Sequence, residues 1–435
     1  MHVGTLLGRL EERAAGDRPI GVAVVGGGVF ASLYLGQALR TPGIRIVGVA
    51  DLAPGRVRER LVAAGWPETA LAATTLTDDV PGLIASAGVD VVVEATGDAP
   101  AGVEHALMAI EQGRHVVMVN VEADALVGPL LARRARAAGV VYTLAYGDQP
   151  ALICELVEWA RLSGFEVVCA GKGTKHLPAY HEVTPASVWE HYGLSTEQTA
   201  GLNAQMFCSF LDGTKSAVEM AAVANATGLV PQARGLAFPA CGSGELASRL
   251  RPVGDGGVLD RTGTLEVVSS VHADGTPVDR DLRWGVYVTI AAADRFVAGA
   301  FAAYGIATSR DGRVAALWRP SHFVGLELGV SVARAALAGE PTGVAHAPIA
   351  EVACRAKRDL RAGEKLDGEG GDHVYGVLRA SGSDADTLPM GLARGARLVC
   401  DIARGDEVRR ADVDLASSGS AARLHAELDR ERRAG

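Results

Sequence analysis

The segment from Gly21 to Asp51 constrains this chain more than any other. It combines two apolar runs with a glycine turn and a helical stretch, in the order apolar 22–25, glycine 26–28, helical 29–40 and apolar 44–50. Short apolar runs bounded by glycine and proline predict buried strands, and the stretch between them is long enough for a crossover helix. The sequence therefore predicts a strand–helix–strand unit of a parallel sheet, closed by Asp51.

The glycine turn has the spacing of a phosphate-binding motif. Gly26, Gly28 and Ala31 match the pattern G-x-G-x-x-A. The first glycine permits a tight turn, the second lets backbone N–H groups approach a pyrophosphate, and the small third residue lets the helix pack against the strand. Asp51 follows at about the 20-residue spacing of a carboxylate that binds the adenosine ribose. The unit predicts a dinucleotide site at Gly26, Gly28, Val29, Phe30, Ala31 and Asp51.

The acidic residue also bears on the choice between NAD and NADP. The carboxylate of Asp51 would repel a 2′-phosphate, which favours NAD. Arg56 and Arg58 follow in the next loop and could instead swing toward such a phosphate. We expect NAD, with NADP as the alternative.

Length and charge limit the other functions open to the chain. Because 435 residues exceed what one core normally supports, we expect two or three domains. The net charge of −9, without a basic cluster, argues against nucleic acid and membrane as partners. Acidic residues stand where a signal peptide needs its apolar core, and the six cysteines lack C-x-x-C spacing. Both features predict a reducing, cytoplasmic setting, and no metal site is expected.

Two further apolar runs, 89–95 and 115–120, continue the predicted parallel sheet. The pair Thr96-Gly97 follows the first run, at the edge where the second half of a cofactor would rest. Asn120 ends the second run and is a candidate for contact with cofactor and substrate, and Glu122 is a candidate for contact with substrate. A strand-end turn with a helix N-cap is the alternative role for both residues.

A second group of candidates follows the strand predicted at 165–170. The next residues, 171–176, form a predicted loop that carries Lys172 and Lys175 beside glycines. Two lysines on such a loop either hold an anionic substrate or phosphate, or are ordinary solvated lysines. Because the loop would follow a buried strand that faces the expected cleft, we expect Lys172, together with Lys175, to bind substrate.

The stretch 207–227 predicts a helix that is buried on most sides, because its apolar residues recur at helical spacing. Asp212, Lys215 and Glu219 share the opposite face at i, i+3 and i+7. A surface ion pair is the ordinary role of such charges. In so apolar a helix they favour catalysis, with Lys215 as the acid/base on the oxygen of an alcohol, Asp212 orienting it, and Glu219 contacting substrate.

Five motifs together resemble the homoserine dehydrogenase-like oxidoreductases with a C-terminal SAF domain, a group that includes deoxyxylulose phosphate reductoisomerase-like enzymes. The motifs are VVVEATG at 91–97, NVEAD at 120–124, GDQP at 147–150, AGKGTK at 170–175 and FLDGTKS at 210–216. The resemblance implies an NAD(P)-dependent oxidoreductase acting on a CH–OH group, with roles for Asp212 and Lys215. The chain departs from true homoserine dehydrogenases at Val121, where these carry a lysine, which argues against homoserine itself.

The C-terminal half holds two more patterns. Residues 265–271 and 284–291 alternate in the manner of an antiparallel pair around a turn at 272–275. Residues 359–366 recur in form at 401–408, each copy a short strand, a glycine turn and another strand. The recurrence predicts a small pseudo-duplicated β module, which the SAF resemblance covers.

These patterns predict an α/β protein. A Rossmann doubly wound parallel sheet precedes an α+β catalytic and dimerisation domain and a small all-β SAF-like domain. The expected boundaries are an N-terminal helix at 1–17, the Rossmann domain at 18–150, the catalytic domain at 151–346, the SAF-like domain at 347–420 and a frayed tail at 421–435.

The expected function is hydride transfer between a nicotinamide cofactor and a small, anionic or phosphorylated hydroxy or oxo compound, with Lys172, Asp212 and Lys215 placing the reacting carbon. The first alternative is a reductoisomerase, which rearranges a carbon skeleton before reducing it. The second is a non-catalytic dinucleotide sensor. A lysine and a carboxylate on a buried helix argue against the sensor, because it needs no proton relay. We expect a homo-oligomer, a dimer.

Overall fold

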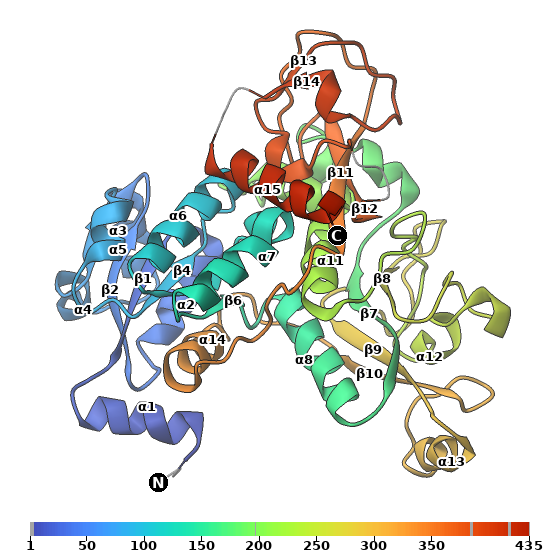
Figure 1. The fold of residues 1–435 in the computed structure, drawn as a ribbon, viewed down its shortest axis with the longest axis horizontal. Coiled ribbons are helices and arrows are strands. Elements are labelled where there is room, and N and C mark those ends of the chain that lie inside the picture. The colour runs from blue at the N-terminus through green and yellow to red at the C-terminus, as the bar shows by residue number, and fades with distance from the viewer. Residues whose placement is uncertain (1–3, 196, 383–385, 416–418, 435) are drawn as a thin grey trace. The chain divides into compact units, whose positions relative to one another are not determined.

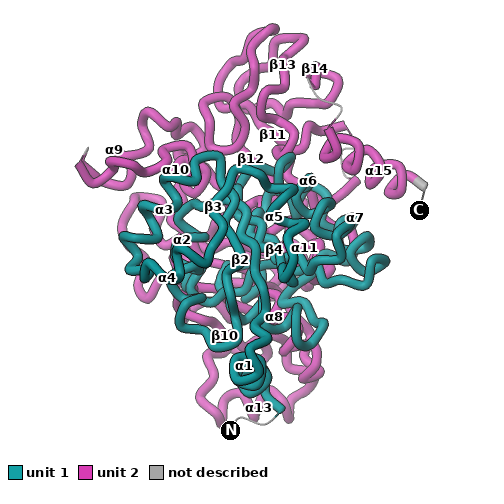
Figure 2. Tube along the Cα trace, turned by 90° about the vertical axis from the view of Figure 1, so that its left-hand side faces the viewer, with its two compact units in different colours: residues 1–152, 323–346 teal, residues 153–322, 347–435 magenta. Residues whose placement is uncertain are grey.

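The computed structural model describes residues 4–195, 197–382, 386–415 and 419–434 (Figure 1). The chain forms two compact units (Figure 2), unit 1 with residues 1–152 and 323–346, and unit 2 with residues 153–322 and 347–435. This division differs from the predicted domains in two respects. Residues 323–346 belong to unit 1, and the residues from 347 onward form one unit with the region predicted to be catalytic.

Unit 1 contains a six-stranded parallel sheet in the order β3-β2-β1-β4-β5-β6. Its strands are β1 Ile20–Val25, β2 Ile44–Ala50, β3 Thr75–Thr77, β4 Val91–Glu94, β5 His115–Met118 and β6 Tyr142–Leu144. All residues of β1 and β4 are buried, as expected for central strands of a parallel sheet. The strand order reverses direction between β1 and β4, which is the switch point of a Rossmann fold. The predicted α/β Rossmann fold is confirmed.

Helices connect these strands. They are α1 Leu6–Ala15, α2 Val29–Ala38, α3 Pro54–Ala63, α4 Glu68–Ala72, α5 Val80–Ala85, α6 Ala99–Glu111, α7 Val121–Ala137 and α14 Gly329–Ala333, which continues as a π-helical turn at Arg334–Ala338. Helix α7 starts directly after Asn120, because the Asn120 side chain accepts a hydrogen bond from Ala123 N (3.1 Å) and caps the helix.

Unit 2 contains a four-stranded sheet in the order β10-β9-β7-β8 (Figure 1). Its strands are β7 Glu166–Thr174, β8 Thr264–Ser269, β9 Val286–Ala291 and β10 Val314–Arg319. The predicted antiparallel pairing of 265–271 with 284–291 is wrong, because β7 lies between them, parallel to β8 and antiparallel to β9. Gly171 permits this insertion, since a Cβ there would lie 1.8 Å from Glu266 O. Residues 171–174 are therefore strand rather than the start of a loop.

The helices of unit 2 are α8 Gln149–Leu162, which starts in unit 1, α9 Val188–Tyr192, α10 Ala204–Leu211, α11 Thr214–Thr227, α12 Leu246–Arg249, α13 Arg295–Ala303 and α15 Ser420–Ala434. The single helix predicted at 207–227 is wrong. Gly213 takes a left-handed conformation (φ 89°) and separates α10 from α11. In the described part of the chain, no helix is both long enough and apolar enough to cross a membrane.

The last part of unit 2 is built on two antiparallel pairs, β11 Ala350–Ala356 with β12 Val374–Ala380, and β13 Arg397–Leu398 with β14 Val413–Asp414. The two sequence repeats pair with each other reciprocally. Leu360 N donates to Ile402 O (2.9 Å), and Ile402 N donates to Leu360 O (3.0 Å). Asp401 Oδ1 accepts from Ala362 N, and Asp359 Oδ1 accepts from Arg404 N, both at 2.9 Å. Each repeat thus satisfies the backbone of the other.

The tail predicted to be frayed is helix α15. Leu424 and Leu428 are buried on its inner face. Arg432 joins it to β11 through an ion pair with Glu351 (3.1 Å). Apolar burial and a partly buried ion pair hold this helix to unit 2 in spite of its high charge.

Candidate functional site

The glycine turn of unit 1 presents backbone donors to open space. Gly26 has a φ of 95°, and a Cβ there would lie 2.7 Å from the Ala95 carbonyl, so only glycine fits where the turns after β1 and β4 meet. Gly28 caps α2 without a side-chain hydrogen bond, and a Cβ there would have no atom within 4 Å. The first N–H groups of α2 are suited to an anion such as a pyrophosphate. Ala31 is fully buried, as close helix–strand packing requires.

Asp51 connects the ends of β1 and β2. Its Oδ2 accepts from Gly27 N and its Oδ1 from Ala53 N, both at 2.8 Å. Each carboxylate oxygen keeps a further lone pair that a ribose hydroxyl could use. Of the two nearby arginines, Arg58 forms an ion pair with Glu68 (2.9 Å) and Arg56 is exposed.

Replacing Asp51 with alanine is expected to weaken NAD binding more than NADP binding, because the variant loses a hydroxyl acceptor and a charge that repels a 2′-phosphate. Titration of both cofactors against the unmodified protein and Asp51→Ala measures the change in preference. Glu59→Ala, an exposed carboxylate on α3, is the control and should leave both affinities unchanged. Tighter binding of NADP by the unmodified protein would contradict the role given to Asp51.

A second polar group lies where β4 ends. Glu94 is fully buried, and its Oε1 accepts from Thr96 Oγ1 (2.6 Å) and lies 3.2 Å from His105 Nδ1. Asn120 Nδ2 donates to Asp98 O (2.8 Å) and lies 3.3 Å from Thr96 Oγ1. Two predicted cofactor residues, Thr96 and Asn120, are thus joined in one network. The sequence reading missed Glu94 and His105, although an acidic residue at the end of an apolar strand was a usable signal.

The other predicted residues of unit 1 lie beside this network. Gly97 takes a left-handed conformation (φ 72°) directly after Thr96. Val29 is exposed and Phe30 is half-buried on the first turn of α2, and Glu122 is half-buried on the first turn of α7. The glycine turn, Asp51 and this network all lie at the carboxyl ends of the parallel strands, where this fold binds ligands.

Asp124 is a buried carboxylate on the first turn of α7. Its Oδ1 accepts from Tyr142 Oη (2.9 Å), and among the described residues Oδ2 has no hydrogen-bond partner. Burial raises the pKa of Asp124 to about 7. The folded protein therefore holds this proton at pH values where the unfolded chain, with a pKa near 3.8, has lost it.

This difference predicts a pH-dependent stability. The raised pKa of Asp124 does not affect the free energy of unfolding below about pH 4, where the carboxyl is protonated in both states. The loss of stability grows as the pH rises toward 7 and is constant above that pH. Asp124→Asn is expected to raise the melting temperature at pH 8 and to change it little at pH 4. The gain in unfolding free energy at pH 8 should exceed that at pH 4 by an amount on the order of a few kcal/mol. Thermal unfolding at both pH values measures it, with the exposed Glu111→Gln as control. An equal effect of Asp124→Asn at both pH values would contradict a buried neutral carboxyl.

In unit 2, Lys172 and Glu219 form a buried ion pair. Lys172 lies on β7 and Glu219 on α11, and the two side chains are only 7% and 5% exposed. Two predicted residues, far apart in sequence, are thus brought together. Gly171 and Gly173 flank Lys172 where neighbouring strands leave no room for a side chain. The rigid sheet and helix therefore fix the position of this pair.

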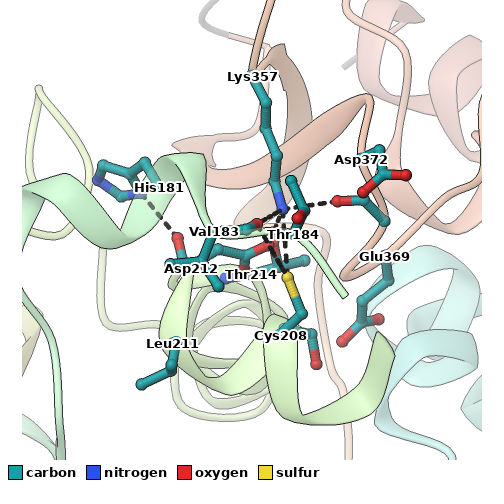
Figure 3. Close-up of polar contacts among 12 residues, drawn as sticks. His181, Val183, Thr184, Cys208, Leu211, Asp212, Thr214, Lys357, Glu369 and Asp372 are labelled. Carbon is teal, nitrogen blue, oxygen red and sulfur yellow. Dashed lines mark hydrogen bonds and ion pairs between the residues drawn. The ribbon is translucent and has the colours of Figure 1, made fainter. Parts of the chain in front are cut away.

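Asp212 has a partner that the sequence did not indicate. Lys357, the residue after β11, forms an ion pair with Asp212 Oδ2 (2.8 Å), and the side chains are 2% and 0% exposed (Figure 3). Lys357 Nζ also donates to Val183 O and Gly371 O, both at 2.7 Å. Three acceptors satisfy the three N–H donors of the ammonium group. Asp212 thus belongs to a buried pair with Lys357, and its role in orienting Lys215 stays a prediction.

Cys208 lies beside this pair, 3.5 Å from Lys357 Nζ. Burial raises the pKa of the Cys208 thiol to about 12, so the thiol stays protonated. Burial alone would lower the pKa of Lys357, yet the attraction of the Asp212 carboxylate raises it above its ordinary value. Lys357 and Cys208 are therefore not poised to exchange protons near neutral pH.

Lys215 lies half-buried on the first turn of α11, one helical turn before Glu219. Lys175 lies just beyond β7, half-buried, with Nζ donating to His191 O (2.7 Å). The lysines 172, 175 and 215 all belong to unit 2. Among the described residues, no group of three or more His, Cys, Asp or Glu side chains could hold a metal ion.

The Rossmann sheet, the uncapped glycine turn and Asp51 have the form of an NAD(P)-binding domain, and two profiles of oxidoreductase domains match the chain. Residues 21–144 match the profile of the homoserine dehydrogenase NAD binding domain. Residues 147–328 match that of the catalytic domain of oxidoreductase DRL. The resemblance to homoserine dehydrogenase-like oxidoreductases is thereby confirmed, while the SAF assignment beyond residue 328 stays a prediction. A search of curated protein sequences finds no match.

Several solved structures are similar to the chain. Biliverdin reductase from Synechocystis in complex with biliverdin and NADP+ shares 18% identity over 37% of this chain and 48% of that chain, with a TM-score of 0.27. An inositol dehydrogenase homolog complexed with NAD+ from Azotobacter vinelandii shares 24% identity over 39% of this chain and 46% of that chain, with a TM-score of 0.30. The reductoisomerase of 1-deoxy-D-xylulose 5-phosphate from Zymomonas mobilis, in complex with NADPH, shares 15% over 63% and 68%, with a TM-score of 0.37. The chain spans about half of the first two, and likenesses of this size say nothing about substrate.

Proposed function

We propose that the protein transfers a hydride between NAD and the CH–OH or C=O group of a small anionic compound, with Lys172 exchanging the proton on the substrate oxygen. The observation that carries this proposal is the buried pair of Lys172 and Glu219. Buried charges are costly, and a lysine with a carboxylate held on rigid elements is a common arrangement for proton exchange.

The chemistry of the pair supports the assignment. An ammonium group has three N–H donors, and within the described residues Glu219 is the acceptor for Lys172. The remaining donors are available to a substrate oxygen. In reduction, the ammonium group gives a proton to the forming alcohol; in oxidation, the neutral amine removes it. Glu219 keeps Lys172 in place through their ion pair.

The residues of unit 1 fit a nicotinamide dinucleotide, which when bound accepts or donates the hydride. The uncapped amides after Gly28 would hold the pyrophosphate, and Asp51 would accept from the ribose hydroxyls. Asn120 and Thr96, joined through the network around Glu94, would contact the second half of the cofactor. NAD rather than NADP follows from Asp51 and from the engagement of Arg58 by Glu68.

A screen of hydroxy acids, polyols and their phosphates for reduction of NAD or NADP tests the function, with analysis of the carbon skeleton of each product. We expect turnover of an anionic compound without rearrangement. A rearranged product would identify a reductoisomerase. Tight NAD binding without turnover of any compound would favour the sensor. A rearranged product and NAD binding without turnover would each contradict the proposal.

A further inference from the structure

Two cations, Lys175 and Arg283, lie together at one end of the sheet of unit 2. Lys175 directly follows β7, and Arg283 lies shortly before β9, the antiparallel neighbour of β7 (Figure 1). Gly173 permits this approach, because a Cβ there would lie 1.9 Å from Leu282 O and 2.9 Å from Arg283 N. Leu282 and Arg283 therefore pack against Gly173 near the end of β7, and Lys175 follows two residues later.

The two cations have no acidic partner. Within the described ranges, neither Lys175 nor Arg283 forms an ion pair, although Arg280 in the same loop pairs with Asp279 (3.3 Å). In the described part of the chain, the hydrogen bond of Lys175 Nζ goes to a carbonyl, His191 O. Burial and then the positive charge of Arg283 lower the pKa of Lys175. Like charges held this close repel each other, and an anion between them would remove that cost.

Aromatic rings hold both cations in place instead. Lys175 Nζ lies 6.0 Å from the ring centroids of Tyr180 and Tyr192. The guanidinium of Arg283 lies 6.0 Å from Tyr192 and 4.9 Å from Trp284, whose side chain is 60% exposed. Cation–π contact orients a cation without neutralising it. We call Lys175, Arg283 and these three rings the Lys175–Arg283 cluster, in which the rings position the two cations and do not act as counter-ions.

We propose that the Lys175–Arg283 cluster binds the phosphate group of a small phosphorylated substrate. The fork of Arg283 suits two phosphate oxygens, and Lys175 supplies a second point charge. This inference rests on the proposed function, because it names the substrate of the site at Lys172, which lies on the strand that Lys175 follows.

The cluster is tested by isothermal titration calorimetry, in which the full chain is titrated with inorganic phosphate in the absence of cofactor. We expect saturable binding that weakens roughly 10- to 100-fold in Arg283→Gln and in Lys175→Gln, as for the loss of hydrogen bonds to a charged group. Arg280→Gln removes an exposed arginine from the same loop and should leave the affinity unchanged. Melting temperatures of the three variants show that each one is folded.

Each outcome decides the proposal. Equal phosphate affinity in all variants, or no saturable binding by the unmodified protein, overturns it. Malonate is the carboxylate comparison at the same ionic strength, and cluster-dependent binding of malonate without binding of phosphate also overturns the phosphate assignment. The phosphate titration measures binding and not turnover, so it is independent of the proposed acid/base. If Lys172→Met retained activity, that result would refute the role of Lys172 and leave the phosphate site standing.

Discussion

Lys357→Met is expected to destabilise unit 2 by about 3–5 kcal/mol, the loss typical when one partner of a buried ion pair is removed. The variant would leave the carboxylate of Asp212 fully buried without its cation, and Val183 O and Gly371 O without their donor. Asp212→Asn should cause a loss of the same kind, because Lys357 would then lack its counter-charge. Urea or thermal unfolding of both variants measures the effect.

Two controls separate the pair from ordinary surface charge. Lys365→Met removes an exposed lysine nearby and should change stability by less than about 0.5 kcal/mol. Combining Lys357→Met with Asp212→Leu should cost less than the sum of the single changes, because neither charge is left alone. Additive losses in the double variant would show that the two side chains do not act as a pair.

Lys172→Met is expected to lower turnover about 10²–10⁴-fold once a substrate is known, with NAD affinity unchanged, because general acid/base groups contribute by that order. The change also leaves Glu219 buried without its cation, which costs stability. Lys172→Met combined with Glu219→Leu should recover melting temperature but not turnover. That contrast distinguishes proton exchange from structural support, because a purely structural lysine would regain both.

Lys215→Met is the matched comparison on the neighbouring helix turn. The sequence favoured Lys215 as the acid/base, whereas the function proposed above gives that role to Lys172. A large loss of turnover in Lys215→Met, together with normal turnover in Lys172→Met, would return the role to Lys215. Saturating substrate separates the two effects further, since a lysine that only holds substrate charge raises KM with little change in kcat.

The fold of unit 1 was predictable because its signals are local. A strand, a glycine turn, a helix and the next strand follow each other within the segment from Gly21 to Asp51, and parallel strands joined by helices leave little choice of topology. Asn120 was expected to contact cofactor and substrate, with a helix N-cap as the alternative, and it caps α7. A residue type that serves both purposes cannot be assigned from spacing alone.

Unit 2 was less predictable because its decisive contacts join distant residues. Gly213 breaks the helix predicted at 207–227, so that Asp212 caps the end of α10 while Lys215 lies on the first turn of α11. The partner of Asp212 lies after β11, and no local pattern links it to Lys357. The alternation at 265–271 and 284–291 identified two strands but not that β7 separates them. Long-range pairing of this kind is set by packing, not by period.

The crossed pairing of the two C-terminal repeats determines where the chain can be shortened. A polypeptide that stops after the first repeat would leave the N–H groups of Leu360 and Ala362 without the acceptors that the second repeat provides. A polypeptide that stops before β11 would instead leave the buried Asp212 without its partner Lys357. Unit 2 therefore has no dispensable C-terminal appendage, and expression of the predicted catalytic region alone should give insoluble protein rather than a minimal enzyme.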